Sequence, residues 1–197
     1  MDTADDAELM LRFQRARDSS AFERLFVRHK DGLLRFLVRL TGEPAMAEDA
    51  SQHTWLKVID VARQGGFEAR PGISFRTWLF TLARNHFIDE YQRKAAHARR
   101  APLAAELPEE AAVHLPAPPN PLDVLQEKQV SEHLNRALRR LPFEQREVIA
   151  LWAAGMELET MVSVIGAPRD TILSRKKYAL AKLRAALSGT VAEERLA

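Results

Sequence analysis

The sequence predicts an all-α protein in which an extended acidic linker joins two small helical bundles. Long segments on both sides of the middle of the chain repeat apolar residues at the three- and four-residue spacing of amphipathic helices. Repeated strand alternation and hairpin turns such as Asn-Gly are absent from both segments. Between them, APLAAELPEEAAVHLPAPPNP is rich in Ala, Pro and Glu and lacks hydrophobic periodicity, which is typical of a linker.

Charge follows the same division. Residues 1–100 carry 17 Lys and Arg against 14 Asp and Glu, residues 101–127 carry none against 5, and residues 128–197 carry 12 against 8. We therefore expect a first domain at 1–98, a linker at 99–121, a second domain at 122–190 and a tail at 191–197. Bundles of about 95 and 70 residues are small and have only modest stability alone.

Composition excludes several classes of protein. A chain of 197 residues with 46% hydrophobic and 28% charged residues suits a soluble globular protein. The absence of cysteine excludes a disulfide framework and a thiolate zinc site, and it fits a reducing compartment. The start, MDTADDAELM, is acidic and lacks the apolar core of a signal peptide, and no apolar run approaches the length of a membrane helix. We expect a cytoplasmic protein without membrane insertion.

The first block begins with two predicted helices, at Ala7–Arg17 and Ser20–Leu40. Asp18 and Ser19 can cap the second helix, because their side-chain oxygens can accept hydrogen bonds from its free N–H groups. Gly42 can end it, since glycine readily adopts the left-handed conformation that closes a helix.

A third helix is expected to start near Pro44, with the sequence PAMAEDASQHTWLKVIDVA. Glu48 and Asp49 stand in its early turns, where acidic groups suit the positive end of the helix dipole. Helix initiation explains this pair as well as an exposed acidic patch for a basic partner does. The segment RQGGFEARPGIS that follows is too rich in Gly and Pro to be helical.

The next helix, FRTWLFTLARNHFIDEYQRK, interleaves aromatic residues with cations and amides. The spacing of its apolar residues predicts a core face made of Phe75, Trp78, Leu79, Leu82 and Ala83. Other residues fall elsewhere around the helix, namely Phe80, Thr81, Arg84 and Asn85. Stacking planes beside phosphate-binding cations are what a protein needs to hold unpaired bases.

The second block predicts a helix at 122–141 that Pro142 ends, and a second helix, FEQREVIALWAAG, that Gly155 ends. A short apolar helix, a turn at Gly166 and a longer helix that starts at Arg169 then form the pattern of a helix-turn-helix. The longer helix carries residues suited to base edges and phosphates, namely Arg169, Ser174, Arg175, Lys176, Lys177 and Tyr178. A structural helical hairpin with a solvated basic face remains the alternative.

The order of these motifs resembles that of bacterial extracytoplasmic-function (ECF, group IV) sigma factors of the sigma-70 family. The resemblance rests on AFERLFVRHKDGLLRFLVRLTG, AEDASQHTWLKV, FRTWLFTLARNHFIDEYQRK, ALRRLPFEQREVIAL and the helix-turn-helix. It implies a sigma domain 2 that reads the −10 element and a sigma domain 4 that reads the −35 element. Such a protein binds core RNA polymerase and promoter DNA, helps to open the DNA, and has no catalytic residues, metal or cofactor of its own.

The resemblance also implies roles for individual residues. Polymerase docking would fall to Glu48, Asp49 and Gln52. The −10 element would be contacted by Phe67, Arg76, Phe80, Thr81, Arg84 and Asn85, with Phe67, in the loop Gln64–Ser74, stacking on a base flipped from the non-template strand. The −35 element would be contacted by Arg169, Asp170, Thr171, Ser174, Arg175, Lys177 and Tyr178.

The chain departs from the family pattern at several positions. His53 stands where Glu is common, and Pro71 and Gly72 lengthen the base-capturing loop. Val162 replaces a usual small Ala in the helix-turn-helix. Leu173 and Tyr178 occupy positions that are often basic.

An anti-sigma factor that holds the protein inactive, in some cases near the inner membrane, is also implied by the resemblance. Two other functions stay open: a sigma-like protein-interaction module and a stand-alone helix-turn-helix regulator. An enzyme is disfavoured, because the six histidines show no metal-ligand spacing and no Gly-rich phosphate loop is present.

Overall fold

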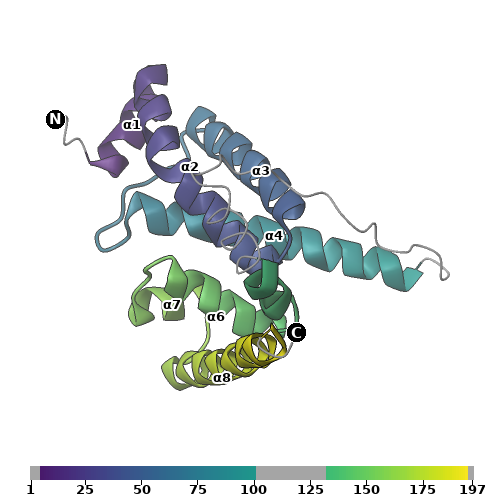
Figure 1. The fold of residues 1–197 in the computed structure, drawn as a ribbon. Coiled ribbons are helices and arrows are strands. Elements are labelled where there is room, and N and C mark those ends of the chain that lie inside the picture. The colour runs from purple at the N-terminus through teal and green to yellow at the C-terminus, as the bar shows by residue number, and fades with distance from the viewer. Residues whose placement is uncertain (1–4, 101–131, 195–197) are drawn as a thin grey trace. The chain divides into compact units, whose positions relative to one another are not determined.

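A computed structural model describes residues 5–100 and 132–194, which are almost entirely helical (Figure 1). The helices are α1 (Asp6–Ala16), α2 (Ser19–Thr41), α3 (Pro44–Arg63), α4 (Phe75–Arg100), α6 (Phe143–Ala153), α7 (Leu158–Ile165) and α8 (Arg169–Glu194), and residues 132–139 are also helical. The all-α prediction is confirmed. Most of the predicted linker and the first part of the helix expected at 122–141 lie outside the described residues, so the domain boundaries stay a prediction.

The described residues divide into two compact units, residues 5–35 with 48–100 and residues 36–47 with 132–194.

The start of α2 confirms the predicted cap. Asp18 Oδ1 accepts hydrogen bonds from the N–H groups of Ser20 and Ala21 at 3.1 and 3.2 Å and from the Ser20 hydroxyl at 2.7 Å. The guanidinium of Arg12, in α1, lies 2.6 Å from the other carboxylate oxygen. The Ser20 hydroxyl, then Arg12 and the Ala21 N–H, lower the pKa of Asp18 from its usual 3.8 to about 2, because each favours the charged carboxylate.

Aromatic rings join the first three helices. The ring centroids of Phe13 in α1 and Phe22 in α2 are 4.8 Å apart, and Phe22 meets Trp55 of α3 edge-on at 5.9 Å. Such tilted and edge-on pairs add to the free energy gained from burial. The core around them includes the fully buried side chains of Leu9, Met10, Leu25, Leu33, Leu79 and Phe80.

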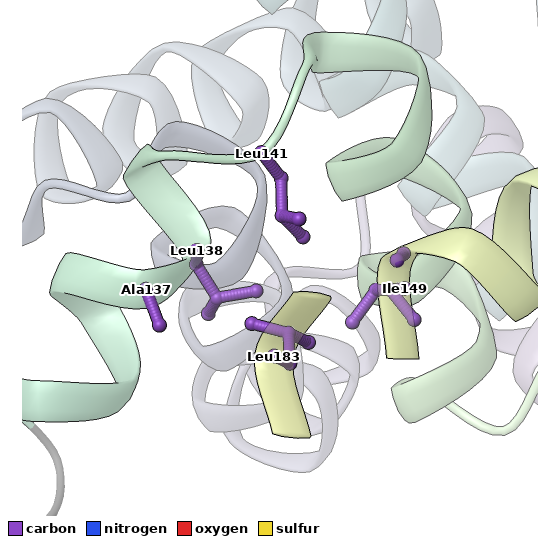
Figure 2. Packing of buried hydrophobic residues seen from close by; sticks show 6 residues of the cluster. Ala137, Leu138, Leu141, Ile149 and Leu183 are labelled. Carbon is purple, nitrogen blue, oxygen red and sulfur yellow. The ribbon is translucent and has the colours of Figure 1, made fainter. Parts of the chain in front are cut away.

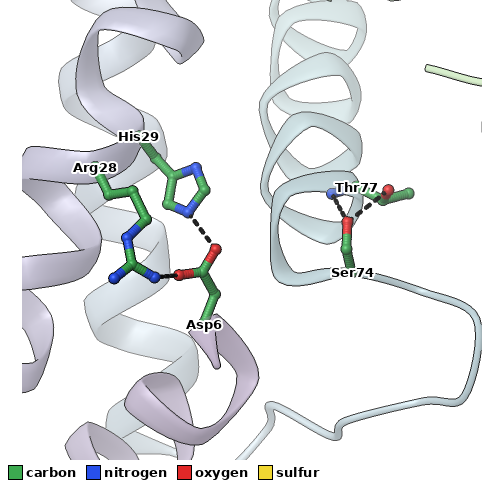
Figure 3. A network of polar contacts seen from close by, with 5 residues as sticks. All are labelled: Asp6, Arg28, His29, Ser74 and Thr77. Atoms are coloured by element: carbon green, nitrogen blue, oxygen red, sulfur yellow. Dashed lines mark hydrogen bonds and ion pairs between the residues drawn. The ribbon is translucent and has the colours of Figure 1, made fainter. Parts of the chain in front are cut away.

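A polar network connects α1 and α2 near the start of α4 (Figure 3). Asp6 pairs with Arg28, and its second oxygen lies 2.8 Å from Nε2 of the buried His29. The His29 ring also lies 5.3 Å from the ring of Phe75, the first residue of α4. Ser74 caps α4 by accepting a hydrogen bond from the Thr77 N–H at 3.1 Å. The first turn of α4 is therefore fixed both by its cap and by packing.

In the C-terminal unit, α6, α7 and α8 all pack on one another. Residues 132–139 join them through a buried cluster that contains Ala137, Leu138, Leu141, Ile149, Ala179 and Leu183 (Figure 2). Between α7 and α8, Gly166 takes a φ of 71° and donates its N–H to the Val162 carbonyl at 2.9 Å. The helix-turn-helix geometry is therefore present as predicted, and Val162 is accommodated half-buried within it.

Candidate nucleic-acid interface

The predicted polymerase-binding residues lie on α3. Asp49 and Gln52 are exposed, and Glu48 is half-buried. His53 folds back on its own helix, with Nδ1 2.9 Å from the Asp49 carbonyl. One turn further along the same side, Leu56 is 59% exposed. The exposed face of α3 is therefore partly apolar, whereas the sequence pattern had drawn attention only to its acidic residues.

The loop between α3 and α4 contains a tight turn. Ile73 donates its N–H to the Arg70 carbonyl at 3.1 Å, and Gly72 takes a φ of 77°. Pro followed by Gly at the two central positions is typical of a type II turn, which requires a positive φ at the second of them. Pro71 and Gly72, which lengthen the loop, thus form its corner.

Phe67 requires a correction. The family resemblance implies that it stacks on a flipped base, but its side chain is only 4% exposed. Its ring packs edge-on against Trp78, with centroids 5.0 Å apart, and lies 6.1 Å from Phe75. In this conformation Phe67 is a hydrophobic anchor that fixes the loop to the start of α4, and its ring presents no free face to DNA.

Phe80 requires the same correction, because it is fully buried. A Cβ built on Gly32 of α2 would lie 3.9 Å from its ring, so α2 approaches α4 closely here. On its outer side, the guanidinium carbon of Arg76 lies 5.3 Å from the ring centroid. A second neighbouring helix therefore buries a face of α4 that the sequence pattern left outside the core.

The remaining predicted −10 residues form a polar edge along α4. Arg76 and Asn85 are exposed, while Thr81 and Arg84 are half-buried. Arg84 donates to the Asn85 side-chain oxygen at 3.0 Å, and the Thr81 hydroxyl donates to the Thr77 carbonyl at 2.7 Å. The edge combines cations with amide and hydroxyl groups, as contacts with a nucleic-acid backbone and unpaired bases require.

On α8, Ile172 and Ala179 face the core of the C-terminal unit, and most of the predicted −35 residues are on the other sides of the helix. The exposed ones are Arg169, Asp170, Ser174, Lys177 and Tyr178, and the half-buried ones are Thr171 and Arg175. The Ser174 hydroxyl donates to the Thr171 carbonyl at 3.0 Å.

Two cations of α8 already have partners. Arg169 donates to Glu159 of α7 at 2.7 Å, and Lys176 holds its ammonium 4.0 Å from the centroid of the Trp152 ring in α6. Lys176 is therefore directed toward α6, unlike the neighbouring exposed Lys177.

Two further residues, one in α1 and one directly after it, contact the loop and the end of α3. Gln14 hydrogen-bonds to the main chain of Phe67, and Arg17 donates to the Arg63 carbonyl. No local pattern marks either residue, because the contacts join positions 46 and 53 residues apart.

Within residues 5–100 and 132–194, no group of three or more His, Asp or Glu side chains could hold a metal ion. In the same part of the chain, no helix has the length and apolar character needed to span a membrane.

Comparison with known proteins gives a consistent result. The Sigma-70 region 2 family matches residues 25–97. The ECF RNA polymerase sigma factor SigL of Mycobacterium tuberculosis is 31% identical over 176 residues, which cover 87% of this chain and 92% of SigL. The ECF RNA polymerase sigma factor RpoE of Cereibacter sphaeroides is 30% identical over 188 residues, which cover 95% of this chain and 97% of that protein.

A similar solved structure is that of the sigma factor RpoE in complex with the anti-sigma factor NepR from Bartonella quintana. It superimposes with a TM-score of 0.67 at 28% identity, and the match covers 85% of this chain and 96% of that RpoE chain.

Proposed function

The chain belongs to the extracytoplasmic-function sigma factors, and on that premise we propose which of its residues bind polymerase and which bind each promoter element. It is an alternative sigma factor, a subunit that binds core RNA polymerase and directs it to promoters for transcription initiation. Its relatives are specificity subunits rather than enzymes. In our proposal it has no catalytic residues of its own.

The first domain, at 1–98, would dock on polymerase through Glu48, Asp49 and Gln52 of α3. A basic surface on the polymerase would complement the two carboxylates, and the exposed Leu56 beside them adds apolar area to the contact.

The same domain would bind the −10 element along the polar edge that runs from the loop 64–74 to Asn85. This edge is the observation that carries the proposal, because Phe75 and Phe80 are buried while the polar residues of the edge stay at least partly exposed. Arg76 is part of it, and the buried Phe80 ring supports its guanidinium from behind. Thr81, Arg84 and Asn85 continue it.

DNA opening by such a surface needs no nucleotide hydrolysis. Extruding a base costs a few kcal/mol, and stacking on an aromatic ring or a guanidinium plane, with backbone contacts, offsets a cost of that size. Because Phe67 and Phe80 are buried, we assign stacking to exposed groups of the loop and to Arg76.

The second domain, at 122–190, would place the first turns of α8 in the major groove of the −35 element. The contacts would come from Arg169, Asp170, Thr171, Ser174, Arg175, Lys177 and Tyr178. Leu173 and Tyr178, which are 44% and 61% exposed, would add apolar contacts such as those that read thymine methyl groups.

An anti-sigma factor would hold the protein inactive. The solved complex of the Bartonella RpoE with the anti-sigma factor NepR supports such a partner. We place the protein in the bacterial cytoplasm. If its anti-sigma factor is anchored in the inner membrane, the complex would be held near that membrane. Co-purification from the native host that yields only polymerase would contradict this regulation.

Run-off transcription tests the function directly. Sigma-free core polymerase is given a library of native promoter fragments with and without this protein. Transcripts that appear only with the protein are expected, and they define its −10 and −35 sequences together. Polymerase binding without transcripts would favour a sigma-like interaction module, and tight duplex binding without polymerase would favour a stand-alone regulator.

A further inference from the structure

Helix α1 contacts the loop 64–74 through the side chain of Gln14, which hydrogen-bonds to main-chain atoms of the loop. The Gln14 carboxamide accepts a hydrogen bond from the Phe67 N–H at 2.8 Å and donates one to the Phe67 carbonyl at 3.2 Å. It thereby satisfies both polar groups of one peptide residue, as a neighbouring β-strand does. The contact is partly buried, so water competes for it less than at an open surface.

A second contact from α1 reaches the beginning of the same loop. Arg17 ends α1 in the left-handed conformation, with a φ of 55°, and its guanidinium donates to the Arg63 carbonyl at 3.0 Å. Arg63 is the last residue of α3. Contacts from α1 and from its C-cap residue therefore hold the chain at 67 and at 63, respectively.

Phe67 is the one buried residue of the loop 64–74. Up to Phe67 it is held by α1 and by the packing of the Phe67 ring on Trp78. From Glu68 to Ser74 every residue is exposed, and the Arg70–Ile73 turn defines its path. The Phe67 main chain is thus the last fixed point before the part of the loop that is free to meet DNA.

We propose that Gln14 is a positioning residue for promoter opening, which holds the main chain of Phe67 so that residues 68–74 present a preformed surface to an unpaired base. This inference rests on the proposed function, in which the loop contacts the −10 element. A loop that is already ordered loses less conformational entropy on binding, so its affinity for the extruded base is higher.

The test uses holoenzyme made with the full chain and a promoter recovered from the run-off library. Abasic sites are placed one at a time along the non-template strand of the −10 element, and open-complex formation is measured. Wild-type holoenzyme should be sensitive at the position of the captured base. The measured quantity is the ratio of open-complex formation on intact DNA to that on DNA with an abasic site at this position. Gln14→Met, which keeps the side-chain length but removes both hydrogen bonds, should lower this intact-to-abasic ratio about tenfold, equivalent to about 1.4 kcal/mol.

Controls separate positioning from a general loss of structure. Arg15→Met changes the exposed neighbour of Gln14 on the same helix and should leave the ratio unchanged. Both variants should bind core polymerase as the wild type does, since the proposed docking residues lie on α3. An unchanged ratio for Gln14→Met in an active holoenzyme would overturn the inference, whereas an inactive wild-type holoenzyme would overturn the proposed function itself.

A second measurement does not depend on any variant. Hydrogen exchange of the free wild-type protein should show the Phe67 amide protected relative to the exposed amides at 68–70. Equal exchange rates at Phe67 and at those positions would also overturn the inference.

Discussion

Arg169, at the first position of the recognition helix α8, donates to Glu159 of α7 over 2.7 Å. Both side chains are more than 60% exposed, so the pair contributes little to folding stability. In the proposed complex, the same guanidinium must approach DNA while the neighbouring carboxylate repels phosphate. Glu159 therefore competes with the −35 element for Arg169.

Glu159→Gln should consequently strengthen binding to promoter duplex. An exposed ion pair is worth about 0.2–1 kcal/mol, so the gain in affinity should reach up to about fivefold. Fluorescence anisotropy with a −35 duplex measures it, and Glu157→Gln, an exposed change of the same charge outside the pair, should have a smaller effect. Equal gains in both variants would indicate only a general reduction of negative charge.

Lys177→Ala should weaken binding to the −35 duplex and reduce the slope of log K against log salt by about 1, because one phosphate contact is lost. Lys176→Ala is the matched control, since its ammonium lies over the Trp152 ring. The control should leave the salt slope nearly unchanged and should lower the free energy of unfolding by about 0.5–1 kcal/mol. A salt slope that changes more in Lys176→Ala would reverse the assignment of the two lysines.

Asp49→Lys should lower the affinity for core polymerase by about tenfold, equivalent to about 1.4 kcal/mol, because it places a cation against a basic partner surface. Asp31→Lys makes the same charge change at an exposed position of α2 and should have a much smaller effect. Surface plasmon resonance with immobilised core polymerase compares them. Similar losses in both would show that net charge, not the α3 face, governs docking.

Phe67→Ala should destabilise the protein by about 3–5 kcal/mol, because it removes a buried ring that packs on Trp78. Asn85→Ala, at an exposed position, should change the free energy of unfolding by less than about 0.5 kcal/mol. It should nevertheless impair promoter opening more than polymerase binding. Urea unfolding followed by circular dichroism separates the two variants, and a fully stable Phe67→Ala protein would contradict the role of Phe67 as an anchor.

The Asp18 cap predicts a dependence of stability on pH. Because folding lowers the pKa of this carboxyl from its usual 3.8 to about 2, the charged form stabilises the folded state above pH 4. This contribution is lost as the pH falls from about 4 toward 2. Asp18→Asn keeps the capping oxygen but not the ion pair with Arg12, so its melting temperature should be lower than that of the wild type at neutral pH. The difference should persist to about pH 4 and shrink below it, and a difference that stays constant to pH 2 would refute the assignment.

The sequence predicted local features well, because their causes lie within a few residues. Asp18, Gly42 and Gly166 each act on their own helix end, and the observed ends of α1 and α2 fall within one residue of the predicted ones. Phe80 was wrongly left outside the core, because helical spacing identifies one buried face and cannot show that α1 and α2 both pack against α4.

Contacts between distant residues were the other features that local patterns could not reveal. The pairing of Gln14 with Phe67 and that of Asp6 with His29 depend on how the helices pack together. The roles in DNA and polymerase binding came from family resemblance and stay predictions for each residue.

The Gln14 contact also has a consequence for engineering. Its carboxamide recognises main-chain atoms, so it accepts any amino acid at residues 68–74 while it fixes where that segment begins. The sequence of residues 68–74 can therefore vary, but the contact that fixes the start of this segment comes from a helix about fifty residues earlier in the chain. A transplant of promoter specificity between relatives that moves only the loop would leave this helix behind, so the recipient has to carry at position 14 a side chain that makes the same two main-chain hydrogen bonds.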